Sequence, residues 1–158
     1  MRDAVQALAG SFKRGSTLLF QLLEDCPDEL WGEQGKGFPY WQHLYHTFHA
    51  MDFFVLPKDA DFGPRPCTAD EAMFRSTPAK PLSKGELRSF GQRMKADADR
   101  WIQSVSDADL AKKHEGCSSR MGSDMTNATV LALLVGHNMY HIGCADTLRR
   151  EAGLKGVM

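Results

Sequence analysis

Residues 39–56 constrain the fold more than any other part of this sequence. Asp52 is the only formally charged residue among them. The segment opens with Pro39, which a first helical turn tolerates, and it stops before Pro57. A helix on a protein surface carries a polar stripe, so a helix with almost no charge is covered on nearly every side. The rest of the chain, or a second subunit, therefore has to enclose this helix.

Three further segments have the length and the apolar spacing of helices. They are residues 3–25, 83–105 and 126–152. Ser83 and Glu86 match a capping box, in which each side chain satisfies an amide at the helix start. Four helices without a clear strand predict an all-α fold, a four-helix bundle that forms a single domain over residues 1–158.

Two connections between these helices are long. Residues 57–82 hold five of the seven prolines, so no helix is expected there. A loop of this length is usually functional or wraps a surface. Residues 106–125 are polar and rich in glycine, a connection with room for a short hairpin. Long crossover connections predict a bundle that does not run simply up and down.

Charge and cysteine content limit the partners and the compartment. The chain carries 19 basic and 20 acidic residues, a formal net charge of −1, which argues against nucleic acid or an anionic membrane as the main partner. The apolar run 130–135 is far too short to cross a bilayer, and the N-terminus does not read as a signal peptide. The four cysteines contain no C-x-x-C pair, so we expect a reduced, cytoplasmic protein.

Five of the six histidines fall in the second and fourth predicted helices. His137 and His141 are four residues apart, so they stand one turn apart on one face of a helix, and apolar neighbours direct that face inward. Two imidazoles at this spacing can reach one metal ion. The alternative is a pair of core histidines, each satisfied by a hydrogen bond. Without the glutamate of a zincin motif, the spacing alone leaves both interpretations open.

The second predicted helix offers three candidates for a further ligand. His43, His46 and His49 follow one another at three-residue steps and spread over about 120° of the helix surface, so periodicity does not choose among them. Asp52 could orient a ligating imidazole as a hydrogen-bond acceptor, or it could be a surface acid. The sixth histidine, His114, lies in a polar connection and is expected to be solvated.

Two segments resemble those of one known family. The stretch 41–54, WQHLYHTFHAMDFF, resembles the second-helix motif of the DinB/YfiT-like superfamily of metalloenzymes. The stretch 136–143, GHNMYHIG, resembles the last-helix motif of that superfamily, with paired histidines and a following glycine. The resemblance covers nearly the whole chain in helix order and loop placement, and it implies a four-helix bundle that is often dimeric. It places one divalent ion, zinc or nickel, on His46, His137 and His141, with His49 as the rival of His46.

The resemblance also implies catalysis, because characterised relatives include thiol-dependent S-transferases and a mycothiol-dependent isomerase. Three imidazoles leave coordination positions open, as is typical of a catalytic site, and a metal there activates either a thiol or water. No carboxylate lies within one turn of His137 or His141 on their inner face, so a general base for hydrolysis is not evident. We therefore expect a metal-dependent enzyme with a small-molecule substrate, and we favour transfer involving a low-molecular-weight thiol over hydrolysis.

Several alternatives stay open at this point. A non-catalytic metal-binding stress-response protein would use the ion to hold two helices together, and a metal-free bundle would contain satisfied core histidines. Cys144, three residues after His141, is either a fourth, soft ligand or a small buried hydrophobe. Tyr140 is expected to belong to the core. The resemblance and the apolar second helix together predict a homodimer.

Overall fold

The computed structural model describes residues 3–33 and 37–158. Four long helices dominate it: α1 (Asp3–Glu24), α3 (Tyr40–Val55), α5 (Lys84–Ser104) and α7 (Asn127–Glu151). Four short ones lie in the connections: α2 (Asp28–Trp31), α4 (Ala69–Ala72), the 3-10 helix η1 (Asp107–Asp109) and α6 (Glu115–Met121). Within the described residues there is no strand, and the all-α prediction is confirmed. None of the described helices combines the length and apolar character needed to cross a membrane.

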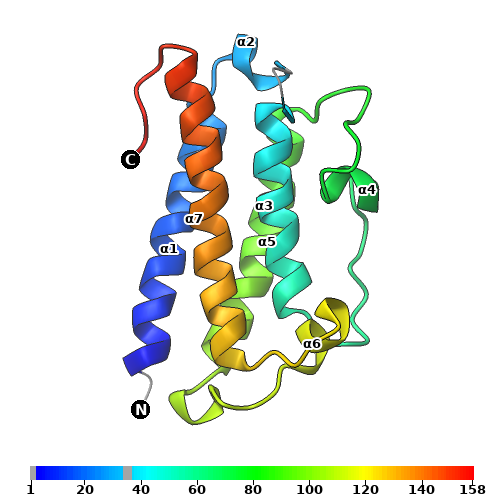
Figure 1. Ribbon diagram of the computed structural model, residues 1–158, viewed down its shortest axis with the longest axis vertical. Helices are drawn as coiled ribbons and strands as arrows, with labels where there is room; N and C mark the ends of the chain where they lie inside the picture. The colour runs from blue at the N-terminus through cyan, green and yellow to red at the C-terminus, as the bar shows by residue number, and fades with distance from the viewer. Residues whose placement is uncertain (1–2, 34–36) are drawn as a thin grey trace.

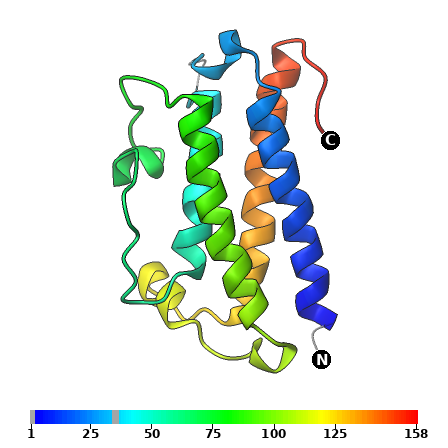
Figure 2. The same ribbon diagram turned by 180° about the vertical axis from the view of Figure 1, so that it is seen from behind.

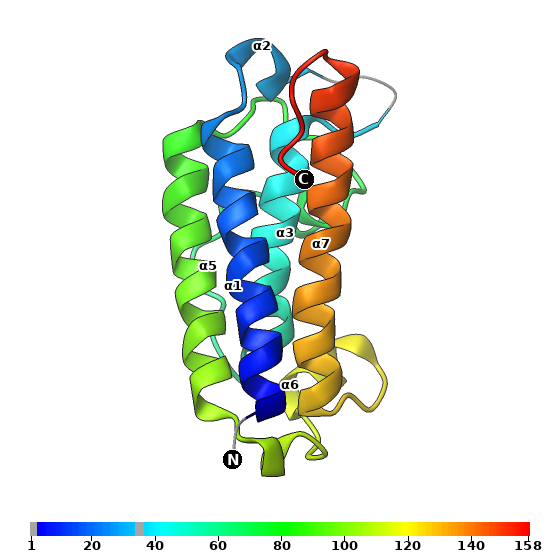
Figure 3. The ribbon, with the colours of Figure 1, turned by 90° about the vertical axis from the view of Figure 1, so that its left-hand side faces the viewer.

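The four long helices lie side by side along one axis (Figure 1). α1 and α7 run in one direction and α3 and α5 in the other (Figure 3). α7 packs against both α1 and α3, and α5 packs against the other side of α3. The order around the bundle is therefore α1, α7, α3, α5. The expectation of a bundle that does not run simply up and down is confirmed, because two consecutive long helices, α3 and α5, are parallel.

The connection between α3 and α5 makes this topology possible. After α3 ends, the chain returns along the outside of the bundle to the end where α5 begins (Figure 2). We call this segment, residues 56–83, the crossover. It is fastened to α3 by an ion pair of 3.0 Å between Arg65 and the buried Asp52. One helical turn, α4, forms in it despite the prolines, because Thr68 and Glu71 complete a capping box.

The other long connection does not cross the bundle. Residues 105–126 stay at the end where α5 stops and α7 starts, and they hold α6 instead of a hairpin (Figure 1). The sequence predicts a solvated His114, and this prediction is wrong. His114 is only 8% exposed. Its Nδ1 accepts from the backbone N–H of Cys117 at 3.0 Å, and its Nε2–H donates to the carbonyl of Val55 at 3.1 Å. His114 therefore caps α6 and joins it to the end of α3.

The chain itself encloses α3. The helices α5 and α7 pack on two sides of it, while α4 and α6 contact it from outside the four-helix core. Its large aromatic residues Trp41, Tyr45 and Phe48 are at most 1% exposed. Burial of α3 thus needs no second subunit, so this helix no longer argues for a homodimer, which stays a prediction based on the family resemblance.

Candidate metal centre

Three histidines meet at the seam between α3 and α7. His46 comes from α3, whereas His137 and His141 come from α7, and each offers a ring nitrogen within 4.8 Å of the other two. The Nε2 atoms of His46 and His137 are 3.0 Å apart. Two nitrogens bound to one tetrahedral zinc ion lie about 3.3 Å apart, so this pair of nitrogens is already close to the spacing of two ligands of one ion. The structure brings together the three residues that the resemblance implied; we call them the three-histidine site.

A backbone carbonyl fixes the tautomer of His46. The Nδ1–H of His46 donates to the carbonyl of Ala72 in α4 at 2.6 Å, so its Nε2 bears a lone pair that faces His137. Such a bond to the second ring nitrogen normally orients a ligating histidine. Gln42, fully buried one turn earlier on α3, donates to the carbonyls of Glu71 and Ser76 at 2.7 Å each. Gln42 thereby holds the turn that presents Ala72 to His46.

The protonation of the three-histidine site also suits a metal ion. Burial, together with the nearby His46, lowers the pKa of His137 to about 4. Burial and the neighbouring histidines lower the pKa of His141 to about 3. Burial lowers the pKa of His46 as well, although its bond to Ala72 opposes the shift. Since neutral imidazole is the form that binds a metal, these residues fit a borderline ion such as zinc or nickel at neutral pH.

Phe74 covers the imidazoles from the side of the crossover. Its ring centroid lies 4.4 Å from that of His46 and 5.8 Å from that of His141. Its φ of 55° lies in the left-handed region, which a bulky side chain rarely adopts. Such an angle persists only where the surrounding packing compensates for it. No sequence motif pointed to Phe74, because its role depends on where the crossover lies.

Two further predicted site residues lie outside the three-histidine site. His49 lines an apolar pocket of about 320 Å³ together with Phe53 and Arg65. Asp52 is 1% exposed, so it is not a surface acid, and its carboxylate binds Arg65. Burial raises the pKa of Asp52, while the guanidinium of Arg65 opposes the shift.

His43 and Cys144 lie beside the three-histidine site. Each offers a ligand atom within 4.8 Å of the other and of one on His141. Cys144 is half-buried rather than part of the core. Tyr140 was expected in the core but is 67% exposed, with its ring edge-on to that of His141 at a centroid distance of 4.9 Å.

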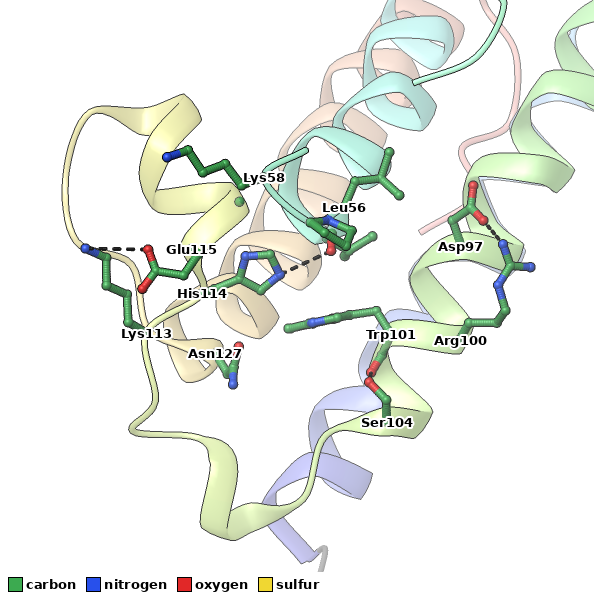
Figure 4. A pocket seen from close by; sticks show the side chains of 13 residues that line it. Leu56, Lys58, Asp97, Arg100, Trp101, Ser104, Lys113, His114, Glu115 and Asn127 are labelled. Carbon is green, nitrogen blue, oxygen red and sulfur yellow. Dashed lines mark hydrogen bonds and ion pairs between the residues drawn. The ribbon is translucent and has the colours of Figure 1, made fainter. Parts of the chain in front are cut away.

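A larger pocket, of about 520 Å³, lies at the end of the bundle between α5, α6 and the end of α3 (Figure 4). Trp101 and His114 meet edge to face in it, with centroids 5.3 Å apart. Its charged side chains are of both signs, among them Lys58 and Glu115. Both ring nitrogens of His114 are occupied by hydrogen bonds, so this pocket offers no free imidazole for chemistry.

The fold and the site define an all-α bundle with a candidate metal centre of histidines from two of its long helices. The family model of the DinB superfamily matches residues 11–145. The chain therefore belongs to the DinB superfamily. The crystal structure of a DinB-like protein from Bacillus cereus ATCC 10987 is similar in fold, with a TM-score of 0.71 and 19% sequence identity over 97% of this chain and 95% of that one. A comparison with curated proteins found no match.

Proposed function

We propose that this protein is a metal-dependent enzyme that holds one divalent ion, zinc or nickel, on His46, His137 and His141. The observation that carries the proposal is the convergence of three neutral imidazoles from two helices, one with its lone pair already oriented by Ala72. Three protein ligands leave a coordination position open, whereas a structural zinc site is closed by four. A divalent ion there supplies Lewis acidity, which favours the deprotonated form of a thiol or of water.

Thiol transfer fits the surroundings better than hydrolysis. Hydrolysis uses a general base within hydrogen-bond reach of the attacking water. Among the described residues, neither group of potential ligands at the seam contains a carboxylate. Aromatic rings stand around the imidazoles instead: Phe74 over His46, and Phe54 at 5.4 Å from His137. An apolar wall of this kind suits a small organic electrophile.

The proposed reaction joins a low-molecular-weight thiol to that electrophile. The thiol proton passes to solvent, the sulfur forms a bond to the electrophilic carbon, and the electrons of the broken bond go to the leaving atom. A halide departs as the anion, whereas an epoxide oxygen stays attached and takes a proton from solvent. Phe74 and the buried imidazoles keep bulk water from one side of the reacting atoms. The reducing cytoplasm, where such thiols are abundant, is the proposed compartment, and the four cysteines of the chain are free.

Metal content and turnover together test this function. Protein purified without an affinity tag should contain about one equivalent of zinc or nickel per chain. His137→Ala and His141→Ala should lose both the ion and the turnover of thiol with alkyl halide or epoxide electrophiles. His49→Ala is the matched control on α3 and should keep the ion. If the metal-loaded protein is inert with broad panels of thiols, electrophiles and hydrolysable esters, the proposed enzymatic function is wrong.

A second candidate function is a non-catalytic metal-binding protein of the stress response. It draws support from the position of the site, since an ion on His46 and His137 would join α3 directly to α7. It predicts a large fall in melting temperature on chelation together with no turnover. Elemental analysis that finds no metal in the untagged protein would instead indicate a metal-free bundle.

A further inference from the structure

A second set of potential ligands lies one helical turn from the three-histidine site. It consists of His43, His141 and Cys144, whose ligand atoms all lie within 4.8 Å of one another. The helices α3 and α7 are antiparallel neighbours (Figure 1). One turn back along α3 leads from His46 to His43. One turn forward along α7 leads from His137 to His141, and from His141 to Cys144. The second set is thus the first shifted by one turn along the same seam.

The second set differs from the first in its donor atoms. It pairs two imidazoles with a thiol, and a thiolate selects soft ions, whereas imidazole and carboxylate suit harder ones. We infer that His43, His141 and Cys144 form a second metal site, which binds a thiophilic ion such as cadmium. Binding replaces the thiol proton of Cys144, which passes to solvent, and forms a metal–sulfur bond.

The side chains of this second site are available for binding. The Nδ1 atoms of His43 and His141 are buried and make no hydrogen bond in the structure. Unpaired buried nitrogens are costly, so a ligand that uses one is favoured. Cys144 is a free thiol and half-buried, so an ion from solvent can reach it. Phe74 lies over this site too, with its ring centroid 5.0 Å from that of His43.

His141 belongs to both sites, which makes them mutually exclusive. A neutral imidazole offers one free lone pair, so His141 serves one ion at a time. A soft ion would therefore draw His141 away from His46 and His137. Cadmium should displace zinc from the three-histidine site at a stoichiometry of one ion per chain.

Cadmium titration of the full chain tests the inference through the near-ultraviolet charge-transfer band of a cadmium–thiolate bond. We expect one equivalent of cadmium to produce the band. Cys144→Ser and Cys144→Ala should abolish it, and His43→Ala should weaken it. His46→Ala and His137→Ala should keep it, because they belong only to the three-histidine site. Cys67→Ser is the matched control for a part-buried thiol away from the seam, and far-ultraviolet circular dichroism confirms that each variant folds.

Three outcomes would overturn the inference. A band that survives Cys144→Ser belongs to another cysteine. A band that also disappears in His46→Ala and His137→Ala would make Cys144 a fourth ligand of the three-histidine site. Simultaneous binding of zinc and cadmium would contradict the exclusive use of His141. The zinc content of the Cys144→Ser variant, measured separately, reports on the three-histidine site alone, so the two sites can fail independently.

Discussion

At the scale of the residue, Phe74 combines a backbone cost with a side-chain gain. A bulky residue in the left-handed region costs on the order of 1–2 kcal/mol. The closest ring contacts that offset this cost are to His46 and to Phe38, whose ring centroids lie 4.4 and 4.7 Å away. The two contributions have opposite signs, so substitutions can separate them.

Alanine at position 74 removes the ring and keeps the strained angle, whereas glycine removes both. We expect both variants to be less stable than the wild type, with Phe74→Gly more stable than Phe74→Ala by about 1 kcal/mol in urea unfolding. Met73 is the matched control, since its φ is −101°. There the order should reverse, with Met73→Ala the more stable. The same order at both positions would show that Phe74 is not strained.

The buried histidines should make the metal-free protein sensitive to acid. Burial lowers the pKa of His49 and of His137 to about 4, from an ordinary value of 6.5. Below pH 6.5 the unfolded chain binds protons that the native state does not, so the free energy of unfolding falls as the pH drops toward 4. Urea unfolding of the chelated protein at pH 7.5 and 5 measures this loss, and His49→Gln should shrink it. A loss unchanged by His49→Gln would place the acid sensitivity elsewhere.

Local spacing in the sequence predicts some of the histidine positions and not others. His137 and His141 follow from an i, i+4 pair on an apolar helix face, and the structure places both at the seam. The choice of His46 came only from the family resemblance, because the chain that covers α3 decides which side of it faces α7 or a pocket. The sequence predicts a solvated His114, which is wrong, because its partner, the carbonyl of Val55, lies 59 residues away along the chain.

At the scale of the element, α3 and α5 approach closely where Gly91 faces Phe48. A Cβ atom at Gly91 would lie 2.8–2.9 Å from atoms of the Phe48 ring, which is fully buried. Gly91→Ala should therefore destabilise the protein by about 1–3 kcal/mol, although alanine favours a helix by about 1 kcal/mol. Gly10→Ala on α1 is the control, because nothing lies within 4 Å of its Cβ position, and it should raise the melting temperature. Thermal unfolding of both variants decides the matter, and a stabilised Gly91→Ala would refute the close packing.

The crossover turn and α3 should be coupled through Gln42. Gln42→Leu removes both bonds to the carbonyls of Glu71 and Ser76, so the carbonyl of Ala72 should no longer hold His46 in one tautomer. We expect zinc affinity to fall about 10- to 100-fold. Nitrogen-15 NMR of the imidazoles should show mixed tautomers for His46. The control is Gln92→Leu at an exposed position on α5. A single His46 tautomer in the Gln42→Leu variant would show that Gln42 does not position His46.

The long helices were predictable from sequence because their ends are marked locally. The capping box of Ser83 and Glu86 and the N-cap of Thr126 are both present. The short helices are harder to predict: α4 has a capping box but only one turn, and α6 is held by tertiary contacts. A Cβ at Gly116 in α6 would collide with the carbonyl oxygen of Leu56, so α6 depends on its close contact with the end of α3.

At the scale of the whole molecule, we expect the core to fold without a metal ion. It contains buried apolar residues from all four long helices, among them Leu19, Leu44, Phe90 and Leu134. An ion that binds only the native state adds stability by mass action, about 2.7 kcal/mol at a concentration one hundred times its dissociation constant. Chelation should therefore lower the melting temperature and leave the helical circular dichroism at 25 °C unchanged. Loss of helicity at that temperature would favour the second candidate function, in which the ion has a structural and not a catalytic role.

The long helices and the crossover contribute different parts of the three-histidine site. Two of the long helices, α3 and α7, supply the three imidazoles, whereas Ala72, which orients His46, and Phe74, which covers the imidazoles, come from the crossover. Exchange of this one segment would therefore change what covers the three-histidine site while the three imidazoles stay in place. Under the proposed function, the substrate preference of this protein should follow the crossover more closely than the helices, and a chimera that carries a foreign crossover tests this directly.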